Sequence, residues 1–513
     1  MFSIIFRHEL HQLRKSKPTV TLFILLAASF CFAIWNGDRA VEKHINASQF
    51  VVNQQMEKKQ SWLNDLIAYE NYAAEHKVPT QIAPTANRPA PYGQPALGNN
   101  AGTVGEKLDD VAVLPPTGLA AFSIGQLDLQ RGYSLVNVKS KFSMSDNYEI
   151  ENPVNLSTGT FDISFVVLFL LPIFILALTY DLFSGEREAG TLALIQTQQV
   201  SMRVFAAAKM CSRATIFLAV IVMAGLAAFA YCATGPVGLG MTDAGVRLAL
   251  WFAAVLVYSL FWFALAVRVN TFGKSSETNA TILSCAWLCL VVIIPTLVSL
   301  TATSLYPAPS HMSFKIAQRA AFAEAEANLD DTKKKFYIDH AEMVPEEDIP
   351  GYTLSFLARQ EAMEKAVEPV YQRFEQQKES QESLVSTFQY ASPAIVAQLT
   401  LNDISGTGSA RFSNYLRQTY AFHAARKDYF LPKYINRQML TSSMYSQFPT
   451  FKYHHENIGN LIGRVLVPLL VLLAATIIVY PRRISMTNKA SSRDASPLDA
   501  PETDPSRQRA DMA

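Results

Sequence analysis

FDISFVVLFLLPIFILALTY, residues 161–180, is an apolar run of twenty residues in which Asp162 is the one charged side chain. A helix needs about 20 mostly apolar residues to cross the hydrocarbon core of a bilayer. The chain contains further runs of similar length and hydropathy; they are residues 18–35, 214–232, 248–267, 281–300 and 458–480. The sequence therefore predicts a mainly α-helical, polytopic membrane protein with six transmembrane helices.

The overall composition agrees with this prediction. Half of the 513 residues are hydrophobic, 17% are charged, and the net charge is +1. A soluble chain of this length normally carries more charge and divides into several domains. A near-neutral balance also gives no reason to expect nucleic acid as a partner. We therefore expect the lipid bilayer to be the environment of the chain.

The positions of Lys and Arg predict how the helices are oriented, because short loops rich in these residues stay in the cytoplasm. Basic clusters precede the first apolar run, separate the second from the third and the fourth from the fifth, and follow the sixth. Both termini are then cytoplasmic, in a bacterial inner membrane. This topology places residues 36–160, 233–247 and 301–457 outside the cytoplasm.

The two ends of the chain differ in character. Residues 1–17 have apolar side chains at helical spacing among basic ones, which predicts an amphipathic helix along the cytoplasmic interface. The first apolar run is longer than that of a signal peptide and no cleavage pattern follows it, so we expect an uncleaved anchor. Residues 481–513 have few apolar side chains and predict a disordered cytoplasmic tail.

The two long polar segments predict an extracytoplasmic domain that is largely helical and built from two insertions. Residues 38–77 are rich in Glu, Gln, Lys and Ala and should continue the first apolar helix. Residues 79–116 contain many Pro, Gly and Asn residues, which predict irregular chain. In the second insertion, we expect helices across residues 314–335 and 354–388.

The sequence offers little catalytic chemistry. Gly273-Lys274-Ser275 resembles the end of a phosphate-binding loop, but Arg268 stands where that loop requires glycine. No His occurs in the six apolar runs and their charges lie near the ends, whereas ion-coupled carriers need ionisable groups near the membrane centre. We expect no enzymatic activity, metal or cofactor in this chain. The alternative is a membrane-embedded hydrolase or transferase that works in the outer segments.

The polar segment 181–213 follows the second apolar run and begins DLFSGEREAGTL, residues 181–192. Gly185 allows the backbone to turn as the chain leaves the membrane. Glu186 and Glu188 would then begin a short helix, where the helix dipole favours carboxylates. Leu192 and Ile195 would give that helix an apolar stripe suited to a groove on another protein.

This segment resembles the signature of type-2 ABC transporter permeases, in which the second span ends in a Gly-Glu-Arg/Lys-Glu-x-Gly-Thr-Leu run. The matching residues are Gly185, Glu186, Arg187, Glu188, Gly190, Thr191 and Leu192. The turn that follows departs from the family pattern at Gln199, Met202 and Ala208, where Pro, Arg and Gly are frequent. The resemblance implies that the matching residues couple the chain to a cytoplasmic ABC ATPase, which binds ATP and Mg²⁺.

The two outer insertions are similar to those of one subgroup of these permeases, which has them between spans 1 and 2 and between spans 5 and 6. That subgroup carries a Ser-Pro-Ala step and a Gly-Thr turn, here Ser392-Pro393-Ala394 and Gly406-Thr407. The resemblance implies an exporter subunit that pairs with a second permease chain, identical or related. From the size of the outer segments alone, we expect them to cap the exit or to hand cargo to a periplasmic partner. The alternative is a membrane receptor or scaffold whose outer domain binds a ligand.

Overall fold

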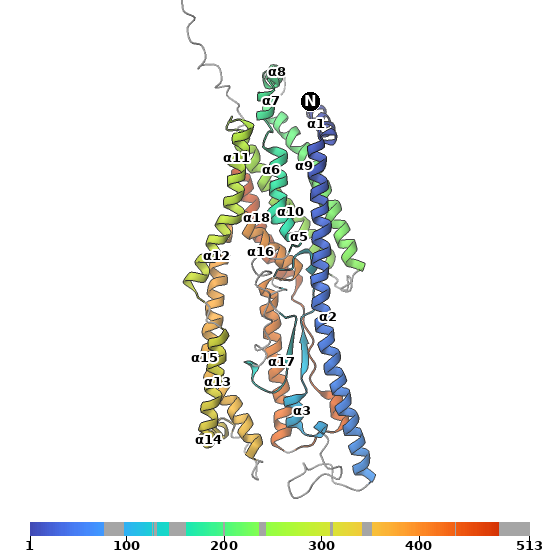
Figure 1. Ribbon diagram of the computed structural model, residues 1–513, viewed down its shortest axis with the longest axis vertical. Coiled ribbons are helices and arrows are strands. Elements are labelled where there is room, and N and C mark those ends of the chain that lie inside the picture. The colour runs from blue at the N-terminus through green and yellow to red at the C-terminus, as the bar shows by residue number, and fades with distance from the viewer. Residues whose placement is uncertain are drawn as a thin grey trace, which may run out of the picture.

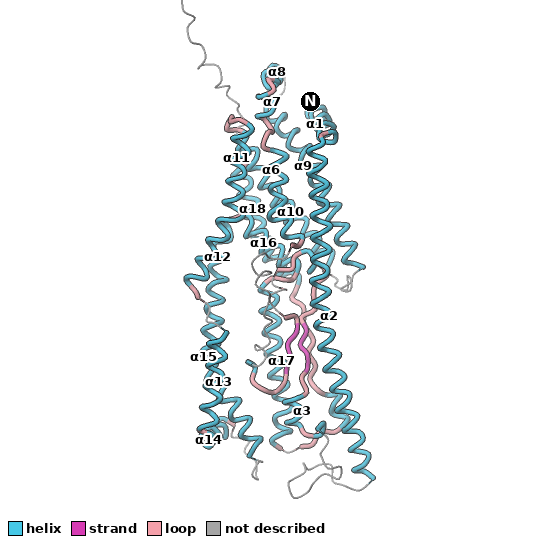
Figure 2. The backbone as a smooth tube through the Cα atoms, viewed as in Figure 1, coloured by secondary structure: helices cyan, strands magenta, loops and turns pink. Residues whose placement is uncertain are grey.

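The computed structural model describes residues 1–75, 97–125, 127, 131–142, 161–198, 201–234, 243–307, 311–340, 351–436 and 438–481. This part of the chain is mainly α-helical and elongated (Figure 1). The N-terminus, α7 and α8 lie at one end, and α3, α14 and the end of α2 lie at the other. The described strands form a single hairpin in the half away from the N-terminus (Figure 2).

Six helical stretches within the described residues are long and apolar enough to cross a membrane. They are α2 (Lys17–Glu75), α5 to α7 (Ile163–Glu188), α9 (Met202–Thr234), α10 (Ala244–Asn270), α11 to α12 (Ser276–Leu305) and α18 (Ile458–Val479). Each stretch coincides with one of the apolar runs in the sequence. Helices of this length and hydropathy indicate a membrane-associated protein.

Two of these stretches contain a wide, π-helical turn beside a proline. The first consists of α5 (Ile163–Phe165), η4 (Val166–Leu170) and α6 (Leu171–Thr179), and the second of α11 (Ser276–Trp287), η5 (Leu288–Ile293) and α12 (Ile294–Leu305). Pro172 and Pro295 have no N–H and crowd the preceding turn, which the wider turn relieves. The carbonyl of Leu168, which Pro172 cannot bond, accepts the buried Tyr258 hydroxyl at 2.9 Å.

Helix α10 lies at the centre of the apolar bundle and packs against α6, α16 and α18. Its Trp251, Tyr258 and Trp262 are completely buried, and large aromatic side chains of this kind dominate the packing of a core. Other helices of the bundle are less buried and expose many large apolar side chains, such as Leu297 of α12 and Ile477 of α18. An apolar outer surface is typical of helices that face lipid or another membrane helix.

The first polar segment is more ordered than the sequence indicates. The helix predicted for residues 38–77 is present, because α2 continues without a break to Glu75, over a total length of about 90 Å. The prediction of irregular chain for residues 79–116 is wrong for the described part. That part contains η1 (Leu97–Asn99), α3 (Ala101–Lys107) and strand β1 (Asp110–Val113). The partner of β1 is the antiparallel strand β2 (Tyr133–Val136), and short-range composition does not reveal such a distant pairing.

The second polar segment is helical, as predicted for residues 314–335 and 354–388. Its helices are α13 (His311–Ala327), α14 (Leu329–Asp339), α15 (Gly351–Phe388), α16 (Pro393–Ser405) and α17 (Ser409–Ile435). One predicted helix is in fact two, because the chain turns at Asn328 between α13 and α14. The polar segments also contain short 3₁₀ turns, namely η2 (Ala120–Phe122) in the first and η7 (Gln389–Ala391) and η8 (Ser442–Gln447) in the second.

The two polar segments pack together as one unit, called here the distal domain, which comprises the described parts of residues 36–142 and 311–457. Leu66 of α2 and Val104 of α3 are buried in one cluster with Phe430 of α17. Val136 of β2 packs with Tyr415 of α17 in a second cluster. Each segment therefore supplies half of a shared core. The predicted tail, residues 481–513, lies outside the described residues apart from Pro481.

Candidate functional site

The permease-like motif lies at the end of the molecule farthest from the distal domain. It forms α7 (Ser184–Glu188) and α8 (Thr191–Thr197), beside the N-terminal helix α1 (Phe2–Lys15) (Figure 1). Helix α1 has the helical structure predicted for it and packs along α9. We call the contact region of α1, α7, α8, the start of α9 and the α10–α11 loop the proximal junction.

The backbone of the motif does not turn where the sequence predicts. Gly185 lies within α7, and the chain turns instead at Gly190, whose φ of +73° is a left-handed conformation that glycine adopts without steric cost. The motif therefore forms two short helices rather than one. The Thr191 hydroxyl spans the break and donates to the carbonyl of Glu186 at 3.1 Å.

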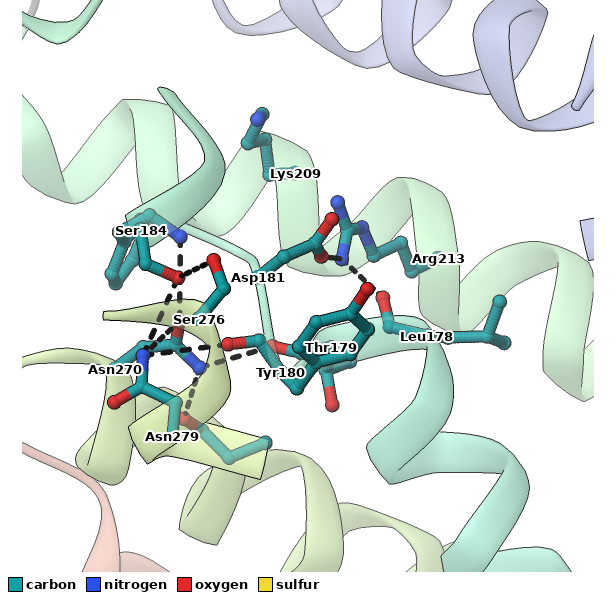
Figure 3. Close-up of polar contacts among 12 residues, drawn as sticks. Leu178, Thr179, Tyr180, Asp181, Ser184, Lys209, Arg213, Asn270, Ser276 and Asn279 are labelled. Atoms are coloured by element: carbon teal, nitrogen blue, oxygen red, sulfur yellow. Dashed lines mark hydrogen bonds and ion pairs between the residues drawn. The ribbon is translucent and has the colours of Figure 1, made fainter. Parts of the chain in front are cut away.

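Two buried asparagines hold the turn that leads from α6 into α7 (Figure 3). Asn270, at the end of α10, donates to the carbonyl of Thr179 at 2.9 Å and accepts the N–H of Phe183 at 3.3 Å. Asn279 of α11 donates to the carbonyl of Tyr180 at 3.4 Å. Backbone groups at a helix end lack partners within the helix, so these amides replace the water that burial excludes.

A buried charge cluster joins three helices at Lys209 of α9. Its ammonium lies 2.7 Å from Glu186 of α7 and 3.2 Å from Glu9 of α1. Lys209 and Glu9 are only 4% and 6% exposed. Removing one partner from a buried ion pair costs about 3–5 kcal/mol, because the other charge is left without compensation. Lys209 thus fastens both the N-terminal helix and the motif to α9.

A second ion pair fixes the end of α6. The guanidinium of Arg213, also on α9, lies 2.8 Å from the carboxylate of Asp181 and donates to the carbonyl of Leu178 (Figure 3). Arginine can serve both groups because it presents several N–H donors in one plane. The chain segment just before α7 is therefore held by α9 as well as by α10.

The remaining charges of the motif bind the loop between α10 and α11. Arg187 donates to the carbonyls of Gly273 and Lys274. Glu188 accepts the N–H of Ser276 at 2.7 Å and its hydroxyl at 2.8 Å, so a carboxylate sits at the positive end of α11. The Gly-Lys-Ser triplet is part of this turn, and its carbonyls serve as acceptors for the motif.

The apolar side chains of α8 are distributed differently from the prediction. Leu192 is buried, with 6% exposure, and Ile195 packs on a cluster that contains Phe183 and Phe205. The predicted stripe therefore faces the protein and is not available to a partner. The large apolar side chain that α8 presents to the outside is Leu194, which is 68% exposed.

Several residues of the proximal junction were not predicted as site residues. They are Glu9, Asp181, Lys209, Arg213, Asn270, Ser276 and Asn279. The available signal was that each is a polar residue close to the end of an apolar run, and that Glu9 is the single acidic residue in a basic N-terminal helix. The residues predicted from the motif and these additional residues form one network. Only the motif could be recognised by its spacing.

The carboxylates, amides and cations of this network bond one another and the backbone, so they hold the helices of the proximal junction together. Across the residues that the structure describes, no group of three or more His, Cys, Asp or Glu side chains could hold a metal ion. The exposed surface of α8, with Leu194 and its polar neighbours, is suited to contact with another protein.

Part of the distal domain matches a protein-family model. A family model described as a domain of unknown function (DUF3526) matches residues 311–454. The match covers the second part of the distal domain, from α13 through α17, and does not reach the proximal junction. Among curated proteins, no match was found.

Proposed function

We propose that this chain is the membrane permease subunit of a bacterial ABC exporter and that a cytoplasmic ATPase docks on α7 and α8. The observation that carries the proposal is the construction of the proximal junction. Helix α8 lies at the end of the molecule and exposes Leu194, while the neighbouring α7 is bonded to α9 and the α10–α11 loop, and through Lys209 to α1. A surface element fastened to several long helices can move them as rigid bodies when a partner pushes on it.

The contacts of the motif favour this role over that of an ordinary charged loop. The charges of such a loop would be solvated and would connect nothing. Here Glu186 bonds Lys209 of α9, while Arg187 and Glu188 both bond the α10–α11 turn, through the loop carbonyls and Ser276. When α7 is displaced, the apolar helices to which it is bonded therefore move with it.

The proposal includes a topology and a set of partners. The proximal junction and both termini are cytoplasmic, the six apolar stretches cross the inner membrane, and the distal domain is extracytoplasmic. Two permease chains, identical or related, pair through apolar surfaces such as those of α12 and α18. ATP and Mg²⁺ bind to the ATPase, so this chain itself is not an enzyme. The distal domain delivers cargo to a periplasmic partner.

The test is purification of the tagged chain from its native membrane, with identification of bound proteins and assay of ATPase activity. In the variant Leu194→Asp, a charge replaces the exposed apolar side chain of α8, so we expect loss of the bound ATPase. Gln196→Asp introduces the same charge at another exposed position of α8 and serves as the matched control. We expect this control to retain most of the ATPase.

Two outcomes would contradict the proposal. If the chain purifies without any nucleotide-hydrolysing partner, a membrane receptor or scaffold becomes the better explanation, with the distal domain as its ligand-binding part. If an ATPase is bound but Leu194→Asp and Gln196→Asp retain it equally, the docking surface is not on α8.

A further inference from the structure

The Ser392-Pro393-Ala394 step and the Gly406-Thr407 turn mark the two ends of one helix, α16, at the boundary between the apolar bundle and the distal domain. Ser392 caps its first turn by accepting the N–H of Ala394 at 3.1 Å, and Pro393 occupies the first helical position. Gly406 ends the helix with a φ of +71°. A side chain at Gly406 would lie 2.3 Å from the methyl group of Thr117, so glycine is also needed for space.

The carbonyl groups at the end of α16 are bonded by side chains from separate parts of the chain. Arg247 of α10 donates to the carbonyl of Ile404 at 2.8 Å and reaches that of Asp403 at 3.5 Å. Thr117, from the first polar segment, donates to the carbonyl of Ser405. The last carbonyls of a helix have no donor within the helix, so these contacts replace water at a buried end.

The arrangement includes α17 and α18 as well. Arg411 of α17 donates to the carbonyl of Gly406 at 3.0 Å. Arg464 of α18 lies 3.7 Å from the carboxylate of Asp403 and is held by Glu456 at 2.6 Å. We call the end of α16 with these surrounding side chains the distal clasp. It joins two apolar helices, α10 and α18, to both segments of the distal domain.

Helix α10 connects the distal clasp with the proximal junction. Arg247 lies near its first turn, and Asn270, which holds the turn into α7, is its last residue. The two residues are separated by 23 positions of uninterrupted helix without proline, or about 35 Å. Arg247 is 9% exposed and is fixed by Asp243 at 2.6 Å, so its position follows that of the helix.

We propose that the distal clasp transmits movement of the membrane helices to the distal domain, and that Arg247 is the positioning residue that makes the connection. The inference rests on the proposed exporter function. A push on α7 displaces Asn270 and α10 with it, and Arg247 then pulls the end of α16. Because Thr117 and Arg411 hold the same helix end, both segments of the distal domain follow.

The experiment measures hydrogen exchange by mass spectrometry on the chain in complex with its ATPase in lipid nanodiscs. Exchange is compared without nucleotide and with Mg²⁺, ATP and vanadate. In the unmodified chain, we expect a nucleotide-dependent change in α7 and α8 and a second change in α17 and the β1–β2 hairpin. In Arg247→Met, the change in α7 and α8 persists, whereas the change in the distal domain is lost.

Matched variants separate transmission from a purely structural role. Arg268→Met removes an exposed arginine from the other end of α10 and is expected to retain both changes. Arg247→Lys keeps a cation that can donate to one carbonyl and is expected to restore part of the distal change. If Arg247→Met does not fold, Thr117→Val breaks the clasp from the distal side and is assessed in the same way.

The outcomes distinguish the two proposals. If the distal change persists in a folded Arg247→Met protein, or if the unmodified chain responds only at α7 and α8, the inference is overturned and the exporter function stands. If no ATPase binds and nucleotide changes exchange nowhere, the exporter function fails, and the role of Arg247 fails with it.

Discussion

The proximal junction and the distal clasp lie at opposite ends of α10, and they are built in different ways. The proximal junction combines ion pairs, such as those of Lys209, with side-chain bonds to the backbone, and most of its residues come from two short stretches around α7 and the α10–α11 loop. The distal clasp also combines ion pairs with side-chain bonds to backbone carbonyls, but its residues come from α10, α16, α17, α18 and the first polar segment, with partners as far apart in sequence as Thr117 and Ser405. The spacing of a local motif therefore marks the first region. In the second region the sequence marks the two ends of α16, and only the folded chain shows which side chains bond them.

The largest effect is expected from breaking the proximal junction at its central charge. Lys209→Met leaves the carboxylates of Glu9 and Glu186 close together without their common cation. We expect a loss of stability of about 3–5 kcal/mol, measured as thermal unfolding in nanodiscs. Lys274→Met, which removes an exposed lysine from the same junction, is the control and should have little effect. Equal stability of both variants would show that the buried charges do not hold α1 and α7.

An intermediate loss of stability is expected when either of the glycines that follow α7 and α16 is replaced by alanine. Gly190 and Gly406 have nearly the same φ, +73° and +71°, but a side chain meets nothing within 4 Å at Gly190 and lies 2.3 Å from Thr117 at Gly406. Gly190→Ala should therefore cost only the left-handed strain, about 1–2 kcal/mol. Gly406→Ala should cost more, because the clasp must also open.

The measurement for this pair is unfolding of the two variants under the same conditions. The difference between them reports the tightness of the distal clasp, since the backbone strain is common to both. If Gly190→Ala is equally or more destabilising, the close approach of Thr117 to α16 does not contribute to stability.

The smallest change in stability is expected when the pH is lowered, because of one buried histidine in the distal domain. His423 is buried against the carbonyl of Lys139 at 2.5 Å. Burial, helped by the charges of Lys427 and Lys141, lowers the pKa of His423, although the hydrogen bond opposes this shift. As pH falls below the ordinary histidine value of about 6.5, the unfolded chain binds a proton before the folded chain does, so stability decreases.

This decrease begins near the unfolded pKa, continues down to the folded pKa and then stops, while above about pH 6.5 the residue contributes no pH dependence. The prediction is checked by measuring thermal unfolding at a series of pH values from about 7.5 to about 5, a range that brackets the reference histidine pKa of about 6.5. His423→Gln should remove this step. His454→Gln changes an exposed histidine of the same domain and should leave it in place.

The helices were more predictable than the contacts between them. All six apolar runs coincide with helical stretches. The continuation of α2 and the helical regions that became α13, α14 and α15 were also predicted from the sequence, whereas α16 and α17 were not. The predictions that failed concern turns and pairing. Glycine is tolerated in many backbone conformations, so the sequence gives no reason to prefer Gly190 over Gly185 as the turn. The structure places the turn at Gly190, and the charged side chains of α7 bond other parts of the chain. Strand β1 was missed because its partner lies far along the chain.

Hydropathy, basic clusters and a short motif determine by themselves that the chain is helical, membrane-associated and equipped with a distinctive segment after its second apolar run. These properties are local, because they depend on side-chain type and spacing. The inward direction of Leu192, the burial of Lys209 and the convergence of Arg247, Thr117 and Arg411 on one helix end were decided by tertiary structure. The partner of a buried polar group is the group that packing brings within hydrogen-bond distance, and the local sequence does not predict which group that is.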